Sequence, residues 1–397
     1  MLIIYCIILG LLIGLGVPEY SKFLQYFDVI FLRLLNLVMP FMIFTMVLKS
    51  VFYIRKNIFK DNSMKLVIMY YSFGTFFSIL IGFAAAYYIE IGVGQDISNL
   101  IKSSDYNNEF NEVVNKGVNL VDLIPSNLIG VLYHRDLMKL FIIGCLLGIV
   151  LNTSKYQNDI LSFIDKVHNF SLEVVNYIMI LVPYALFSLV IRLSIDRFIS
   201  LGVLSKLALL FVVLYIVRYV ILLLEIYFIG GISPLPFIKK SFRYQSVAFI
   251  SMSSKGTLPI ANEDMKSMGI SKGSRQYAVS IGSMLNAIGF GLDLTATIVF
   301  ILNVYGVVIG FNDFLMIIFL SFIGIIIALG IPGGTIVALT VVLKFFGIPY
   351  EILSIVLIIE RIADMFCTTL IVSGIVGYTL VIDGYKGNLN QSKYYDN

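Results

Sequence analysis

Charged residues are scarce in this sequence. They make up 13% of its 397 residues, whereas hydrophobic residues make up 59% and the mean hydropathy is +0.95. A soluble domain carries about 25% charged residues, so this chain has too few to cover a globule of its size. The composition therefore excludes a soluble protein and predicts that much of the apolar surface faces lipid.

Residues that carry most enzyme chemistry are also scarce. The chain has no tryptophan, only the histidines His134 and His168, and three widely separated cysteines, Cys6, Cys145 and Cys367. This set argues against a disulfide framework and against a metal cage. No hydrolase, zinc-protease or phosphate-loop motif is present, and the net charge of +4 is too scattered for a nucleic-acid partner. We therefore expect neither an enzyme nor a bound cofactor.

Long apolar runs, by contrast, are frequent. A bilayer core needs about 20 apolar residues per helix, and the chain holds about eight such runs. They are residues 2–17, 27–54, 66–93, 137–152, 170–195, 201–231, 276–306 and 352–382. The first run has neither a positively charged start nor a cleavage site, so we expect a membrane span rather than a signal peptide.

The charges between these runs predict the orientation, because cytoplasmic loops carry an excess of Lys and Arg. Basic residues gather in two places: Arg55, Lys56, Lys60 and Lys65, and then Lys239, Lys240 and Arg243. The segment 93–125 is acidic and is expected outside. We expect both termini, including the tail 384–397, to be cytoplasmic in a multi-pass protein of a bacterial inner membrane.

Two further apolar stretches, 247–260 and 314–348, are interrupted by small residues and proline. Unwound backbone persists at membrane depth only where protein or a cavity satisfies it, and paired broken segments are typical of transporter sites. A helix that begins in mid-membrane offers N–H groups to an anion, and one that ends there offers carbonyls to a cation. The sequence therefore indicates two re-entrant hairpins, with kinks in ordinary spanning helices as the alternative.

The motifs at these interruptions resemble a known family. Ser253-Ser254-Lys255-Gly256-Thr257-Leu258-Pro259 and Gly330-Ile331-Pro332-Gly333-Gly334 are similar to the two hairpins of the dicarboxylate/amino acid:cation symporters, the glutamate-transporter family. Segments 31–40, 124–127 and 182–189 are similar to its second, fourth and fifth helices. The similar segments occur in the same order and extend over nearly the whole chain.

The resemblance implies an all-α membrane protein of about eight transmembrane helices and two re-entrant helical hairpins. It implies an elevator-type homotrimer, in which a transport domain slides across the bilayer against a scaffold. We assign the scaffold to residues 1–65 and 105–230, the transport domain to 66–95 and 231–383, and the tail to 384–397.

The resemblance also implies a substrate site. In it, Asp364 holds the amino group of the substrate and Thr368 a polar group, whereas the family's arginine and asparagine are replaced by Cys367 and Ile371. Arginine pairs with an acidic substrate side chain, so its loss favours a neutral substrate. The expected site residues are Ser253, Ser254, Lys255, Gly256, Thr257, Pro332, Gly333, Asp364, Cys367, Thr368 and Ile371.

The sodium sites depart from the family pattern. The family's Asn-Met-Asp-Gly-Thr stretch reads Asn286-Ala287-Ile288-Gly289-Phe290 here, and a second sodium-binding aspartate is Ile375. An isoleucine side chain has no oxygen to ligate a cation. The residues left for a weak cation site are Asn286, Gly289, Asp293 and Ile375. We expect Na⁺ or H⁺ as the coupling ion, with weak or absent sodium coupling.

These observations predict a secondary active symporter for a small neutral amino acid. Lys255 leaves alternatives open: it replaces a lost cation, pairs with Asp364 or Asp293, faces a substrate carboxylate, or snorkels to the cytoplasmic surface. A carboxylate partner would make the protein an acidic amino acid or dicarboxylate symporter. A non-transporting receptor or channel with the same fold is the alternative of another class. Arg218 and Glu225 are expected to face a subunit interface or headgroups.

Overall fold

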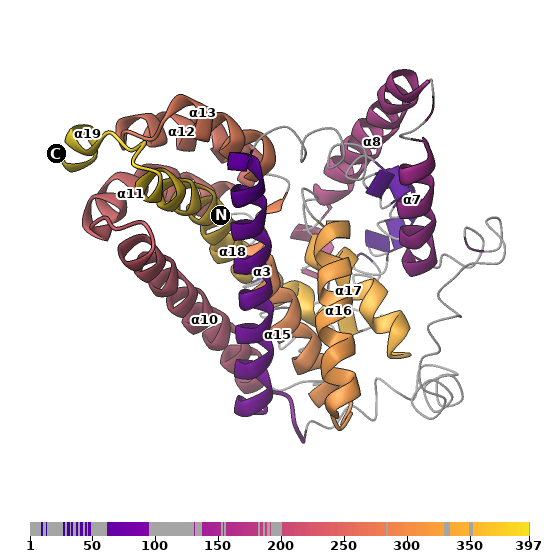
Figure 1. The fold of residues 1–397 in the computed structure, drawn as a ribbon. Helices are drawn as coiled ribbons and strands as arrows, with labels where there is room; N and C mark the ends of the chain where they lie inside the picture. The colour runs from indigo at the N-terminus through magenta and orange to yellow at the C-terminus, as the bar shows by residue number, and fades with distance from the viewer. Residues whose placement is uncertain are drawn as a thin grey trace. The chain divides into compact units, whose positions relative to one another are not determined.

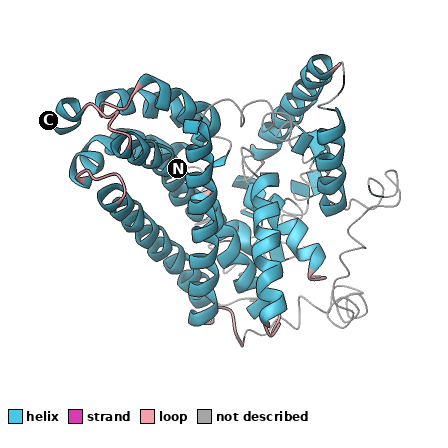
Figure 2. Cartoon of the chain, in the orientation of Figure 1, coloured by secondary structure: helices cyan, strands magenta, loops and turns pink. Residues whose placement is uncertain are grey.

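The computed structural model is helical, and no strand occurs in the residues that it describes (Figures 1 and 2). These are residues 62–94, 137–151, 156–181, 201–282, 285–328, 334–348 and 352–396, with single positions between 9 and 48, at 131 and 154, and between 183 and 191. The expected all-α fold is confirmed within these ranges. The number of spanning helices and the elevator architecture stay predictions.

Most of the helices overlap an expected apolar run. The helices are α3 (Asn62–Ile89), α7 (Leu137–Leu151), α8 (Gln157–Met179), α10 (Leu201–Phe228), α11 (Pro234–Ser251), α12 (Ser254–Ser267), α13 (Lys272–Tyr277), α15 (Ile288–Val304), α16 (Phe311–Ala328), α17 (Gly334–Phe345), α18 (Ile352–Tyr385) and α19 (Gln391–Tyr395). Within the described ranges, 68–89, 202–228 and 359–385 are long and apolar enough to cross a membrane. The first two fall within the predicted spans 66–93 and 201–231, and the third overlaps the predicted span 352–382 and ends beyond it.

Helix α8 begins well before the expected run 170–195. Its buried positions recur every three or four residues, at Ile164, His168, Ser171, Val175 and Ile178. Charged residues between them lower the mean hydropathy, so a search for continuous apolar runs misses the first half of an amphipathic helix.

The chain divides into two compact units, which we describe separately. The first comprises residues 1–57, 94–204 and 331–358. Its core includes Leu48 and Ile164, with Leu147 and Leu151 of α7 packed against them. The small residue Gly144 allows this packing, because a Cβ there would lie 3.0 Å from Cγ1 of Val47.

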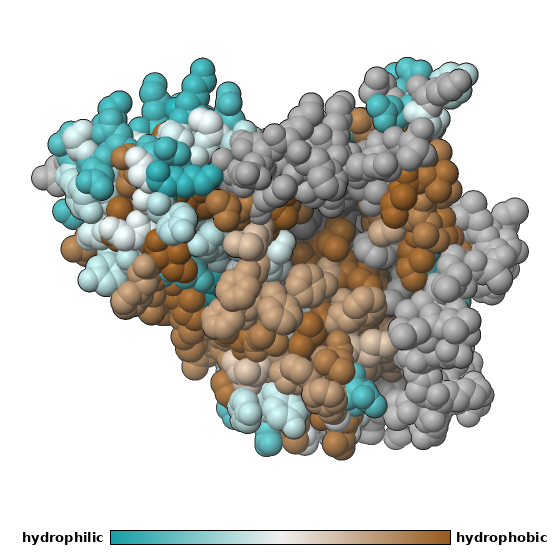
Figure 3. Space-filling view, viewed as in Figure 1, coloured by the Kyte–Doolittle hydropathy of each residue, from teal (hydrophilic) through white to brown (hydrophobic). Residues whose placement is uncertain are grey.

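The second unit comprises residues 58–93, 205–330 and 359–397. Helix α3 lies along α15, and α18 is largely buried among its neighbours (Figure 1). Hydrophilic residues gather at the end where α12, α13 and α19 lie, and hydrophobic residues cover the visible surface around α3 (Figure 3). A few hydrophilic residues also lie at the opposite end of this face (Figure 3), so the distribution is that of a membrane-embedded bundle with polar ends.

Helix α10 has two faces in this unit. Residues at helical spacing are buried on one face: Leu207, Phe211, Leu214, Arg218, Leu222 and Ile226. The residues between them are exposed and almost all apolar: Leu209, Val213, Ile216, Val220, Leu224 and Tyr227. An exposed apolar stripe with this spacing is what a lipid-facing helix surface requires.

The predicted division into a scaffold and a transport domain concerns how parts of the chain move during transport. It stays a prediction, because the two compact units are defined by packing alone.

Candidate functional site

The first interrupted segment is a helical hairpin. Helix α11 ends at Met252, which adopts a left-handed conformation with φ of 50°, and Ser253 caps the start of α12. The Ser253 hydroxyl accepts a hydrogen bond from the Gly256 backbone N–H at 3.1 Å. Because α11 and α12 pack against each other, the predicted break is confirmed. That it re-enters the membrane stays a prediction.

Hydroxyl groups hold the tip of this hairpin together. The Thr257 side chain is buried and donates to the Ser253 carbonyl at 2.8 Å. Its Oγ1 also lies 3.4 Å from Oγ of Ser251. Lys255 and Gly256, in the first turn of α12, are exposed, and Ser254 is half-buried. The pairing of Lys255 with Asp364 or Asp293 stays a prediction.

The predicted seventh helix is broken at the stretch identified from the sequence. Asn286 and Ala287 leave the helical path, and α15 starts at Ile288. The Asn286 amide donates to the Ile371 carbonyl of α18 at 2.7 Å, and the Ala287 N–H donates to the Thr75 hydroxyl of α3 at 3.3 Å. The side-chain oxygen of Asn286 is buried without a hydrogen-bond partner among the described residues. The break thus leaves an amide oxygen available to a ligand.

Two glycines let α18 approach this break. A Cβ on Gly289 would lie 2.5 Å from the Cys367 carbonyl oxygen. A Cβ on Gly374 would lie 2.7 Å from Nδ2 of Asn286. Four predicted site residues, Asn286, Gly289, Cys367 and Ile371, are therefore brought together.

Asp364 and Thr368 form a pair one helical turn apart on α18. The Thr368 hydroxyl donates to Oδ1 of Asp364 at 3.3 Å. Thr368 is buried and Asp364 is half-buried. Phe366 connects this part of α18 to the first hairpin, since its ring packs edge-on against Phe249 of α11 at 5.1 Å.

The two isoleucines at the lost carboxylate positions fill the core. Ile288 and Ile375 are fully buried, and Cγ2 of Ile375 lies 3.0 Å from where a Cβ on Gly282 would be. Asp293 is buried on α15. Among the described residues, no group of three His, Cys, Asp or Glu side chains is placed to hold a metal ion.

The tip of the second interrupted segment, including Pro332 and Gly333, lies outside the described residues. The flanking helices α16 and α17 are present on either side of it in the chain.

Sequence reasoning missed the largest buried polar group of the second unit. Arg218 was expected at a subunit interface or near headgroups, but its side chain is 0% exposed, so that expectation is wrong. Its Nε donates to Ser78 Oγ at 3.0 Å and its Nη2 donates to the Tyr378 hydroxyl. An i, i+7 spacing within an otherwise apolar helix does not say which face is buried, so no sequence signal identified this contact.

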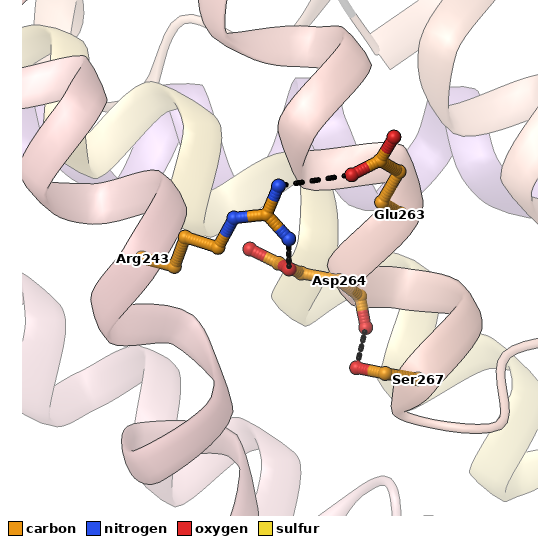
Figure 4. A network of polar contacts seen from close by, with 4 residues as sticks. All are labelled: Arg243, Glu263, Asp264 and Ser267. Carbon is orange, nitrogen blue, oxygen red and sulfur yellow. Dashed lines mark hydrogen bonds and ion pairs between the residues drawn. The ribbon is translucent and has the colours of Figure 1, made fainter.

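Charged residues link the two arms of the first hairpin away from its tip (Figure 4). Arg243 of α11 contacts Glu263 at 3.0 Å and Asp264 at 3.4 Å, both on α12. The Arg243 and Glu263 side chains are 61% and 67% exposed. Exposed charges cannot face hydrocarbon, so this end of the hairpin faces water or headgroups.

The described part of the predicted tail 384–397, residues 384–396, is folded onto the same end of the unit. Asp383 is buried and accepts from the Ser271 N–H at 2.7 Å and from the Ser274 hydroxyl at 2.5 Å. Beyond it, the Tyr394 hydroxyl donates to the Ser233 carbonyl at 2.7 Å, and the Lys240 ammonium donates to the Lys393 carbonyl at 2.7 Å. Burial raises the pKa of the Tyr394 phenol. The C-terminus thus fastens α18 to the start of α11.

Helices that are broken in mid-segment, as at Asn286 and at the first hairpin, are a general feature of secondary transporters. The chain matches the sodium:dicarboxylate symporter family over residues 1–385, and it belongs to that family.

Three similar proteins illustrate the relationship. The proton/sodium-glutamate symport protein of Bacillus subtilis (strain 168) is 26% identical over 406 residues, covering 98% of this chain and 92% of that protein. The protein of the same name from Geobacillus stearothermophilus is 26% identical over 403 residues, with coverages of 98% and 94%. The C4-dicarboxylate transport protein 1 of Pseudomonas paraeruginosa is 24% identical over 347 residues, with coverages of 85% and 77%. The chain is therefore a multi-pass membrane protein of a transporter family, and that family is not one of enzymes.

Proposed function

We propose that this protein is a symporter for a small neutral amino acid, with weak or absent sodium coupling. It works as an elevator-type homotrimer in a bacterial inner membrane. The observation that carries the substrate proposal is Cys367, which is buried at the position of the family's arginine and beside the Asp364–Thr368 pair. A thiol cannot make the bidentate contact that a guanidinium makes with a carboxylate, whereas Asp364 can receive an ammonium group.

The coupling proposal is supported by Ile288 and Ile375. Both are buried and apolar where the family resemblance places sodium-binding aspartates. A cation buried without such oxygens carries an uncompensated desolvation cost of roughly several kcal/mol. The Asn286 oxygen alone does not replace two carboxylates. The coupling ion is therefore H⁺ or weakly bound Na⁺, and transport assays compare these two ions.

The second candidate is an acidic amino acid or dicarboxylate symporter, with Lys255 as the partner of a carboxylate. The exposed side chain of Lys255 in the first turn of α12 favours it, as do the printed names of the relatives, which are glutamate and C4-dicarboxylate carriers. In that case Lys255→Ser abolishes transport of the acid, whereas under our proposal it leaves the substrate preference unchanged.

Counterflow in proteoliposomes tests the proposal. Vesicles loaded with unlabelled alanine, serine, aspartate, glutamate or succinate are diluted into the same labelled compound. We expect exchange with a neutral amino acid. Exchange confined to aspartate, glutamate or succinate would contradict the substrate proposal. Ligand binding without any exchange would indicate a receptor.

A further inference from the structure

Lysines from three helices lie together at the base of the first hairpin, where α11, α12 and α19 meet. The Lys240 ammonium of α11 donates to the Lys393 carbonyl of α19 at 2.7 Å. A Cβ on Gly269 would lie 3.2 Å from Cβ of Lys393, and the Gly269 N–H donates to the Lys266 carbonyl of α12 at 3.2 Å. Lys239, beside Lys240 in the chain, is exposed, as are Lys266 and Lys393. We call these three exposed residues, Lys239, Lys266 and Lys393, the base lysines.

The positive charge of the base lysines is not balanced by nearby acidic side chains. Among the described residues, no carboxylate lies within ion-pair distance of any of the three. The acids of this end have other partners: Glu263 and Asp264 contact Arg243, and the buried Asp383 accepts hydrogen bonds at the start of α13. Asp396 is exposed. Like charges held together repel each other, so an anion bound at this corner would stabilise it.

An exposed apolar stripe runs along α11 beside these lysines. Leu235, Ile238 and Phe242 are 65%, 40% and 73% exposed, and their spacing of three and four residues places them on one face of the helix. Tyr395, also exposed, accepts a hydrogen bond from the Ser233 N–H just before α11 at 3.3 Å. An apolar stripe bordered by lysine and tyrosine is typical of a helix at the membrane interface. A phospholipid offers an acyl chain to the stripe and a phosphate to the lysines, whereas a soluble anion offers only the second.

We propose that the base of the first hairpin is a binding site for an anionic phospholipid, whose phosphate contacts the base lysines and whose acyl chain lies along the apolar stripe of α11. The hydrophilic residues around α12 and α19 border hydrophobic surface in Figure 3, as a site at headgroup level requires. The cytoplasmic leaflet carries anionic lipids, in agreement with the side predicted for this end. The site is separate from that of the transported substrate and depends on neither the proposed substrate nor the proposed coupling ion.

The base lysines can be replaced without loss of a contact that holds the fold. Their side chains form no hydrogen bond or ion pair with other described residues, and Lys240, which does form one, is kept. The variant Lys239→Gln/Lys266→Gln/Lys393→Gln removes the charge, and the same three positions changed to arginine retain it. Lys206→Gln is the matched control, because it removes an exposed lysine near the start of α10, at the far end of that helix from α11.

The test measures Tm of the purified full-length protein in neutral detergent. Short-chain phosphatidylglycerol, phosphatidylcholine of the same chain length and inorganic phosphate are titrated separately at equal ionic strength. In wild type, phosphatidylglycerol should raise Tm by about 2–4 °C more than phosphatidylcholine, because a ligand that binds only the folded state stabilises it. The triple glutamine variant should bind phosphatidylglycerol more weakly, by about fivefold for each lysine removed. The triple arginine variant and Lys206→Gln should behave like wild type.

Three results would contradict the lipid site. The first is equal stabilisation of wild type by phosphatidylglycerol and phosphatidylcholine, and the second is an unchanged affinity for phosphatidylglycerol in the triple glutamine variant. The third is equal stabilisation by inorganic phosphate and phosphatidylglycerol, which would indicate a site for a free anion. If the triple glutamine variant cannot be purified, Lys239→Gln alone decides: about fivefold weaker binding supports the site, and unchanged binding contradicts it. Because Tm is measured without transport, failure of the proposed substrate in counterflow leaves this result unaffected.

Discussion

At the scale of single residues, we propose that substrate choice depends on Cys367, which stands where the family resemblance places an arginine. The thiol is 1% exposed, and its own backbone carbonyl forms part of the contact with Gly289. The side chain at this position is small and uncharged. One turn earlier on α18 is Asp364, whose carboxylate can receive an ammonium group. Under the proposed function, this combination of one retained and one lost charge favours a neutral substrate.

Changing Cys367→Arg should shift preference from neutral amino acids toward aspartate or glutamate. A well-formed pair between Arg and a carboxylate, worth about 1.5–3 kcal/mol, corresponds to a change of about tenfold to a hundredfold in relative affinity. Competition against a labelled neutral substrate measures the shift. Cys367→Ser is the matched control and should leave the preference unchanged. If the wild-type protein already prefers aspartate, this prediction is wrong, and Lys255 becomes the expected partner of the substrate carboxylate.

The close approach at Gly289 gives a second residue-scale prediction. Gly289→Ala places a Cβ against the Cys367 backbone carbonyl, which cannot move without shifting α18. We expect a loss of about 1–3 kcal/mol in stability, as for overpacking generally, with transport impaired as well. Gly273→Ala is the control, because nothing lies within 4 Å of its added Cβ. An unchanged Tm in Gly289→Ala would show that the break and α18 are not tightly packed.

At the scale of elements, the sequence predicts breaks better than buried partners. Ser253 marks the break of the first hairpin because a capping serine has a local effect on the backbone, whereas Pro259 lies inside α12 and does not end it. The break at Asn286 followed from the family resemblance. Arg218 and the early start of α8 could not be predicted, because the sequence does not show which face of a helix the rest of the bundle covers.

The prediction at the scale of elements concerns the contacts of the C-terminal segment. Asp383 is a buried acceptor for both the Ser271 N–H and the Ser274 hydroxyl at the start of α13. Asp383→Asn replaces one acceptor oxygen with a donor, and we expect a loss of about 1–3 kcal/mol. Thermal unfolding of the purified protein measures it, and Asp396→Asn, at an exposed position, should have no effect. Equal Tm values for the two variants would mean that the C-terminus does not fasten the hairpin end.

At the scale of the whole molecule, the orientation stays a prediction, which rests on the loop charges and on the polar end of the second unit. Exposed charges of the first hairpin and the docked C-terminal segment share that end (Figures 1 and 3). The basic residues Lys239, Lys240 and Arg243 predict, by the positive-inside rule, that this end is cytoplasmic.

A single cysteine in place of Asn397 tests that orientation. In a variant whose three native cysteines are replaced, the thiol should react with a membrane-impermeant maleimide only after the cells are opened. A cysteine placed in the acidic segment 93–125, for example at Asn107, is the control and should react in intact cells. Labelling of position 397 from outside would reverse the topology.

The central claim is that a member of the sodium:dicarboxylate symporter family has lost most of its sodium dependence. Initial rates of neutral amino acid uptake into proteoliposomes, measured across a range of Na⁺ with choline as replacement and at two pH values, test it most directly. We predict rates that change little with Na⁺ and respond to pH, because Ile288 and Ile375 bring no oxygen to the former cation sites. A steep, cooperative rise in rate with Na⁺ would show that other oxygens bind sodium and would contradict the account.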